Sequence, residues 1–272
     1  MEAFIRSLNS GIRYALLLMA VIAYFGGPLP TGLIRSIATH GRLTQSHRIQ
    51  RSKWIDLFEF EVSKKLWTLF YLFGAIWTGF WIVQTQKHTD RWALNKNTFI
   101  VLILYEVHLV RRFVECILVT KFGSSKMKLA GVLVGLVHYL IVPLAILSDE
   151  NVRLREDGDL FKLAGVLLFL KASYHQWRCN SILARIKGEN NQYGVPHGDW
   201  FTYVQCPLYT AEILIYFAFS CILAFRNHTL SLVFLWVCAN QSVSARLSSE
   251  WYRKHFSKQA HLPKWKLIPF TW

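Results

Sequence analysis

Long apolar blocks separated by short polar loops limit how this chain can fold more than any other feature. A helix that crosses a bilayer needs about 20 consecutive, mostly apolar residues. Seven blocks of this kind can be placed in the 272-residue sequence, at 12–34, 66–84, 98–119, 129–147, 160–183, 203–225 and 229–246. The sequence therefore predicts an all-α, polytopic membrane helix bundle with about seven transmembrane helices.

The loops between the blocks are short, and the sequence contains no internal repeat, low-complexity tract or linker. We therefore expect a single membrane-embedded domain over residues 1–272. The five cysteines show no close-paired spacing, and no group of histidines and cysteines has the spacing of a zinc site. The sequence predicts no bound metal.

The formal net charge of +15 would suggest a nucleic-acid partner in a soluble protein. Here the basic residues flank the apolar blocks. If the seven blocks alternate across a bilayer, the loops on one side carry 18 Lys and Arg residues and those on the other side carry 6. Because cytosolic loops are enriched in Lys and Arg, we expect a lumenal N-terminus, a cytosolic C-terminus and no nucleic-acid partner.

The third block is unusual for a membrane helix because it carries several ionisable residues. One helix face, within about 120° of arc, holds Tyr105, His108, Arg111, Arg112 and Glu115. Charges at the centre of a membrane helix cost a few kcal/mol each, so this face is expected to line a polar cavity inside the bundle. A purely structural ion-pair network among Arg111, Arg112 and Glu115 would explain the same pattern.

The sixth block follows a turn-rich segment and carries a carboxylic acid in apolar surroundings. Tyr209, Glu212 and Tyr216 fall on one helix face, at steps of three and four residues. An ionisable residue in a membrane helix usually marks a functional site or a buried partner. We therefore predict that Glu212 belongs to the site, whereas Tyr216 more often represents packing.

A series of motifs occurs in one order along the chain. It comprises Arg111–Cys116, Gly198–Phe201 with Tyr203, Cys206–Pro207, Tyr209, Ala211–Glu212, Asn240–Gln241, Trp251–Tyr252 and Leu267–Phe270. Together these motifs resemble the signature of the steroid 5-alpha-reductase family, and most closely its polyprenol reductase branch. The resemblance covers the chain from about residue 105 onward, which makes 105–272 the expected catalytic half.

The resemblance implies a reductase that binds NADPH among its later helices. The cofactor-binding candidates that follow from it are Gln176, Asn180, Lys187, Tyr193, Asp199, Tyr252 and Arg111. The substrate-binding candidates are Arg112, Glu115 and Trp200. Lys187 has a second interpretation, as an anchor at the membrane edge. No Gly-x-Gly-x-x-Gly fingerprint follows a strand, so a dinucleotide would not bind as in a Rossmann domain.

The chemistry of double-bond reduction limits the substrate. A hydride adds to the β-carbon of an enal or enone once the carbonyl oxygen is polarised, whereas an allylic alcohol offers no position that accepts negative charge. The site therefore needs a donor at the carbonyl oxygen. Four catalytic candidates could supply it: Tyr209, Tyr105, His108 (where steroid-acting relatives have a tyrosine) and a protonated Glu212. For Glu212 the resemblance favours a second role, that of orienting the nicotinamide carboxamide.

The favoured function is NADPH-dependent reduction of the alpha-isoprene double bond of polyprenol or polyprenal, leading to dolichol for protein N-glycosylation at the endoplasmic reticulum membrane. Reduction of a 3-oxo-steroid 4-ene or of a trans-2-enoyl-CoA is an alternative within the same class. A seven-span receptor or transporter is an alternative from another class. The expected partner is a long-chain polyprenyl lipid, and no obligate protein partner is inferred.

Overall fold

The computed structural model describes residues 10–16, 60–87, 95–124, 126–148, 159–187, 194–256 and 262–269. Its long helices are α4 (Trp67–Lys87), α5 (Lys96–Leu118), α6 (Leu129–Leu147), α7 (Asp159–Lys187), α8 (Pro207–Ile222) and α9 (His228–Phe256). The short elements are strands β1 (Glu61–Ser63) and β2 (Lys126–Lys128) and the 3₁₀ turns η1 (Lys64–Leu66) and η2 (Asp199–Thr202). The predicted all-α class is confirmed in its coarse form, since the two strands form only a small antiparallel pair.

Each long helix corresponds to one of the predicted apolar blocks, from the second to the seventh. The fourth block, 129–147, coincides with α6, and the second, third and fifth agree with α4, α5 and α7 to within four residues at either end. The first block, 12–34, lies mostly outside the described residues. A helix at 10–16 covers its beginning.

Helix α8 begins at Pro207, four residues after the predicted start of its block at 203. The backbone N–H of Gln205 donates to the carbonyl oxygen of Trp265 at 2.9 Å, and the next N–H donates to the following carbonyl at 3.0 Å. These bonds attach the C-terminal segment, residues 262–269, to the chain just before α8. The helix then starts at proline, which lacks the N–H that a first helical residue does not need.

Helix α9 continues ten residues past the predicted end of the last block at 246. Residues 247–256 are too polar to extend an apolar span, which is why hydropathy places the end earlier. They contain neither glycine nor proline, so nothing in the backbone interrupts the helix. The extension carries Ser248, Trp251 and Tyr252 beyond the apolar part of the helix.

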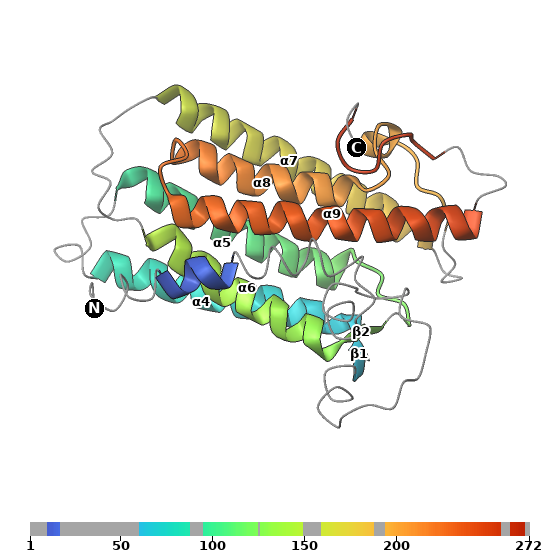
Figure 1. The fold of residues 1–272 in the computed structure, drawn as a ribbon, viewed down its shortest axis with the longest axis horizontal. Helices are drawn as coiled ribbons and strands as arrows, with labels where there is room; N and C mark the ends of the chain where they lie inside the picture. The colour runs from blue at the N-terminus through green and yellow to red at the C-terminus, as the bar shows by residue number, and fades with distance from the viewer. Residues whose placement is uncertain are drawn as a thin grey trace.

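The six helices form two groups that run along the long axis of the molecule (Figure 1). Helices α7, α8 and α9 lie side by side in one group, and α4, α5 and α6 form the other. The β1–β2 pair and the C-terminal segment lie at the same end of the bundle. The largest buried apolar cluster contains residues from each of the helices α5, α6, α7, α8 and α9, among them Leu109, Phe169 and Phe219.

Two helical segments within the described residues are long and apolar enough to cross a membrane, Lys64–Lys87 and His228–Phe256. Shorter apolar helical stretches occur at Gly131–Leu147 and Pro207–Ile222. Large apolar side chains remain exposed on the outer faces of α4 and α7, among them Leu69, Ile76, Phe80, Leu163, Leu167 and Leu170. Such faces suit contact with lipid, so the fold is that of a helical protein with membrane character.

The close packing of α7 on α8 depends on Gly165. A Cβ atom at this position would lie 2.6 Å from Cγ1 of Ile222 and 2.8 Å from the carbonyl oxygen of Ala218. The side chain could move aside, but the helix backbone could not do so without shifting α8. Glycine is therefore the residue that allows this approach.

We predict that Gly165→Ala destabilises the protein by about 1–3 kcal/mol, the usual cost of overpacking a core. The apparent melting temperature of the detergent-solubilised protein should fall. Gly79→Ala is the matched control, because nothing lies within 4 Å of a Cβ at Gly79; alanine there should leave the melting temperature unchanged or raise it. Equal melting temperatures for the two variants would contradict this account of the packing.

Candidate active site

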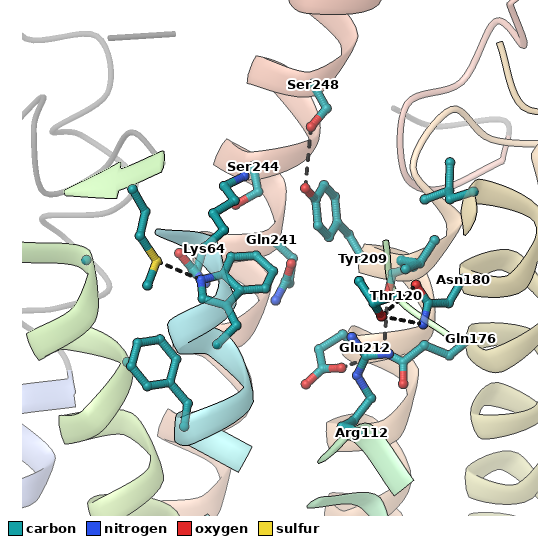
Figure 2. A pocket seen from close by; sticks show the side chains of 18 of the residues that line it. Lys64, Arg112, Thr120, Gln176, Asn180, Tyr209, Glu212, Gln241, Ser244 and Ser248 are labelled. Carbon is teal, nitrogen blue, oxygen red and sulfur yellow. Dashed lines mark hydrogen bonds between the residues drawn. The ribbon is translucent and has the colours of Figure 1, made fainter. Parts of the chain in front are cut away.

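A cavity of about 490 Å³ lies between the two helix groups and is lined by all six long helices. One wall comes from α7, α8 and α9 and is mainly polar. The other comes from α4 and α6 and is mainly aromatic and apolar. Figure 2 shows Lys64 at one side of this space, with Tyr209, Gln176 and Asn180 at the other. A cavity with one polar and one apolar wall suits a ligand pair of mixed chemistry.

Glu212 lies at the centre of the polar contacts. Nε2 of Gln176 donates to Oε2 of Glu212 at 2.6 Å (Figure 2), and Nε2 of His108 lies 3.5 Å from Oε1. Arg111 in turn donates to Oε1 of Gln176 at 2.5 Å, which fixes the orientation of that amide. The carboxylate of Glu212 therefore accepts hydrogen bonds here, and this arrangement gives no support to its predicted role as a protonated donor.

The proton on His108 can be assigned from its neighbours. Nη2 of Arg111 lies 3.2 Å from Nδ1 of His108, and arginine has no acceptor. Nδ1 must therefore accept, which places the ring proton on Nε2, the nitrogen that faces Glu212. His108 is 1% exposed and does not line the cavity.

Arg111, Arg112 and Glu115 form the ion-pair network that the sequence offered as an alternative. Both arginines bond to Glu115, one to each carboxylate oxygen. The network also extends to α7, because Nδ2 of Asn180 donates to Oε2 of Glu115 at 3.2 Å and to Oγ1 of Thr120 at 3.1 Å. Arg112 and Asn180 line the cavity, so the network is structural and borders the site at the same time.

The end of the cavity near β1 and β2 carries several groups able to bind an anion or a sugar. Lys187 is 8% exposed, and its Nζ donates to the backbone carbonyl of Lys121 at 2.7 Å. The hydroxyl of Tyr209 lies 3.4 Å from Oγ of Ser248, and Tyr252 lines the same end. We call these five residues the polar rim. The extension of α9 past residue 246 is what brings Ser248 and Tyr252 to it.

Three polar side chains of α9, Asn240, Gln241 and Ser244, line the cavity between the polar rim and its deeper part. Within the described part of the chain they make no hydrogen bond to another residue. Figure 2 places Gln241 and Ser244 beside the open space. Such side chains can bond to a ligand without first breaking a protein contact.

The structure brings some of the predicted residues to the cavity and leaves others apart. Of the candidates, those that line it are Tyr209, Glu212, Gln176, Asn180, Lys187, Tyr252 and Arg112. His108, Arg111 and Glu115 stand directly behind them. Tyr105 is fully buried between Tyr216 and Phe219 and does not reach the cavity. Tyr193 lies outside the described residues.

Asp199 and Trp200 lie away from the cavity lining, against a different side of α7. Nδ1 of His175 donates to the Asp199 carboxylate at 2.7 Å, and the ring of Trp200 stacks on that of His175 at 4.4 Å. Burial raises the pKa of Asp199, but the bonds from His175 and from the backbone N–H of Trp200 outweigh it, so the pKa is lower than usual. These contacts attach the loop before α8 to α7, and the ligand-binding roles of the two residues remain predictions.

Several lining residues were not predicted from the sequence. Tyr71 on α4, His138 and Tyr139 on α6 and Trp236 on α9 all border the deep part of the cavity. Nε1 of Trp236 donates to Nδ1 of His138 at 3.2 Å, and the other ring nitrogen lies 2.8 Å from the hydroxyl of Tyr216. Little in the sequence points to these residues, because aromatic side chains in apolar helices face lipid or core as often as a site.

Comparison with known proteins agrees with the motifs. Residues 146–272 match the model of the family described as 3-oxo-5-alpha-steroid 4-dehydrogenase. The polyprenal reductase of Danio rerio is 28% identical over 259 residues, which cover 82% of this chain and 83% of the relative. The polyprenal reductases of Ailuropoda melanoleuca and Homo sapiens are each 29% identical over 237 residues, 72% of this chain and 74% of each relative. The resemblance of this chain to the steroid 5-alpha-reductase family, and within it to polyprenal reductases, is therefore confirmed.

Proposed function

We propose that this protein is a membrane-embedded reductase that uses NADPH to saturate the alpha-isoprene double bond of polyprenal, in the route to dolichol. The observation that carries the proposal is the cavity in which Glu212, Gln176 and Arg112 border an aromatic wall. The similarity to polyprenal reductases over most of the chain points to the same substrate. The aldehyde is preferred to the alcohol because only a carbonyl conjugated to the double bond can take up the charge of a hydride.

The polar wall has the chemistry that a phosphorylated dinucleotide requires. Lys187 offers a positive charge to phosphate at the polar rim, and Tyr252 and Asn180 offer groups for ribose or adenine. The amides of Asn240 and Gln241, which bond to no other residue in the part of the chain that the structure describes, add donors and acceptors deeper in the cavity. These residues fit NADPH, which would supply the hydride. Gln176, held by Glu212 and Arg111, is placed to orient a carboxamide at the deep end.

The other wall suits an isoprenoid chain. Trp67 and Phe70 of α4 face the cavity together with Gly131, Val134 and Gly135 of α6. A Cβ at Gly135 would lie 3.0 Å from the ring of Phe70, so the two helices already approach closely there. Apolar and aromatic side chains exclude water from a branched hydrocarbon, and burial of each CH₂ group contributes about 0.8 kcal/mol. This wall would hold the isoprene units next to the aldehyde.

The orientation in the membrane follows from the charge distribution. We propose seven transmembrane helices in one domain, with the polar rim and the C-terminus in the cytosol and the N-terminus in the lumen of the endoplasmic reticulum. The loops assigned to the cytosol hold three times as many Lys and Arg residues as the others, 18 against 6. A cytosolic polar rim would also be reached directly by a cytosolic nucleotide.

A steroid substrate is the second candidate, favoured by the description of the matching family as a 3-oxo-5-alpha-steroid 4-dehydrogenase. It shares the chemistry of an enone and differs in having a rigid ring system in place of a flexible chain. The purified protein, assayed with NADPH, should reduce polyprenal in preference to polyprenol and to a 3-oxo-4-ene steroid. Faster reduction of the steroid would reverse the assignment, and no NADPH oxidation with any of them would favour a receptor or transporter.

We predict that Glu212→Gln lowers turnover of polyprenal at least tenfold, which corresponds to about 1.4 kcal/mol of activation free energy. The amide keeps the shape of the carboxylate, but it is neutral and brings its own donor toward Gln176, which already donates, and toward Nε2 of His108, 3.5 Å away. Glu106→Gln is the control, because Glu106 is an ionisable residue of α5 that does not line the cavity. If both variants are made in normal amounts and Glu212→Gln retains wild-type turnover, Glu212 is not part of the site.

We predict that Lys187→Ala raises the Michaelis constant for NADPH several-fold and leaves that for polyprenal nearly unchanged. The substitution would remove a charge that binds a phosphate equally in the ground state and the transition state. Lys126→Ala is the matched control, since Lys126 lies on β2, pairs with Glu61 and does not line the cavity. A variant that loses affinity for the lipid but not for NADPH would assign Lys187 to the other ligand.

A further inference from the structure

Reduction of an enal needs a proton as well as a hydride, and the predicted donors are poorly placed to supply it. Nε2 of His108 faces Glu212, and the ring does not reach the cavity. Tyr105 is enclosed in the core, and Glu212 accepts bonds from its neighbours. Tyr209 lies beside Ser248 at the polar rim (Figure 2), away from the deep end.

The deep end of the cavity offers a different hydroxyl group, that of Tyr71 on α4. Tyr71 lines the cavity together with Arg112, Glu212, His138 and Tyr139. Both ring nitrogens of His138 have partners in Trp236 and Tyr216. Within the described residues at this end, the two tyrosines are therefore the groups that can offer an O–H proton to a ligand.

The surroundings of Tyr71 distinguish it from Tyr139. The guanidinium of Arg112 lies over the Tyr71 ring, 5.3 Å from its centroid, so its positive charge is close to the Tyr71 side chain. Tyr139 meets Tyr71 edge-on, with ring centroids 5.5 Å apart.

This geometry matters after proton transfer. The phenolate left on Tyr71 would form beside the positive charge of Arg112, whereas Tyr139 reaches that charge only through Tyr71. A negative charge that develops next to a fixed cation in a site with little water is strongly stabilised. Tyr139, whose ring packs edge-on against that of Tyr71, would keep the Tyr71 ring beside Arg112.

We propose that Tyr71 is the proton donor of the reaction and that Arg112 and Tyr139 position and support it. The inference rests on the proposed function. The Tyr71 hydroxyl first donates a hydrogen bond to the aldehyde oxygen. NADPH held by the polar wall would supply a hydride to the β-carbon; as the C=C electron pair moves toward the carbonyl, the O–H bond of Tyr71 breaks and its proton passes to the aldehyde oxygen. The product is the enol of the saturated aldehyde, which tautomerises, and water reprotonates Tyr71.

The kinetic test compares variants that remove one hydroxyl each. Tyr71→Phe should lower kcat for polyprenal at least 100-fold, within the range of a general acid, and change the Michaelis constant for NADPH less than twofold. Tyr139→Phe should lower kcat less than tenfold. Tyr174→Phe, on the exposed face of α7, should match the wild type. A Tyr71→Phe variant with kcat within threefold of the wild type, or a larger loss for Tyr139→Phe, would overturn the proposal.

A second measurement does not depend on turnover. Geranial, a short isoprenoid enal, is bound to the protein with oxidised NADP⁺, and the C=O stretching frequency is recorded by Raman difference spectroscopy. The wild type should lower this frequency relative to geranial in detergent, Tyr139→Phe should keep most of the shift, and Tyr71→Phe should abolish it. An unchanged shift in Tyr71→Phe would refute the inference alone. Absence of bound geranial in the wild type would refute the proposed function, and the inference with it.

Discussion

The burial of charge inside an apolar helix bundle is the constraint on which the rest of this structure depends. Glu115 and Arg112 on α5 are nearly inaccessible to solvent, and Glu212 on α8 lies in an otherwise apolar helix. Burial of each of these charges without a partner would destabilise the fold by several kcal/mol. The bonds from Gln176 and Asn180 of α7 connect these groups. Helices α5, α7 and α8 must therefore meet at this level, and the cavity forms where they do.

The same arrangement separates the two kinds of chemistry that a lipid reductase needs. The amides and charges come from α7, α8 and α9, which lie side by side, and the aromatic and glycine residues come from α4 and α6 (Figure 1). A hydrated cofactor and a hydrocarbon chain can thus approach one point from different walls. Arg112 and Tyr71 lie where the walls meet, so the guanidinium of Arg112 both pairs with Glu115 and borders the cavity.

Much of this could be predicted from the sequence because hydropathy and helical periodicity are local properties. Six of the apolar blocks became the six long helices, and the face shared by His108, Arg111 and Glu115 is a consequence of spacing alone. One boundary that differed depends on a distant segment. Helix α8 starts late because residues near 265 bond to the chain before it, and no local signal reports such a contact.

The sequence by itself determined the helices, the polar faces of the third and sixth blocks, and the family motifs, since each depends on residue type and spacing. Only the tertiary structure decided which polar residues share the cavity. In the folded protein Tyr105 lies in the core, Asp199 and Trp200 pack against α7, and Tyr71 lies beside Arg112. The reason is that the spacing of residues along a helix determines which side chains share a face, but not which other helix packs against that face. Which face meets which depends on how the buried charges of all the helices pair at once.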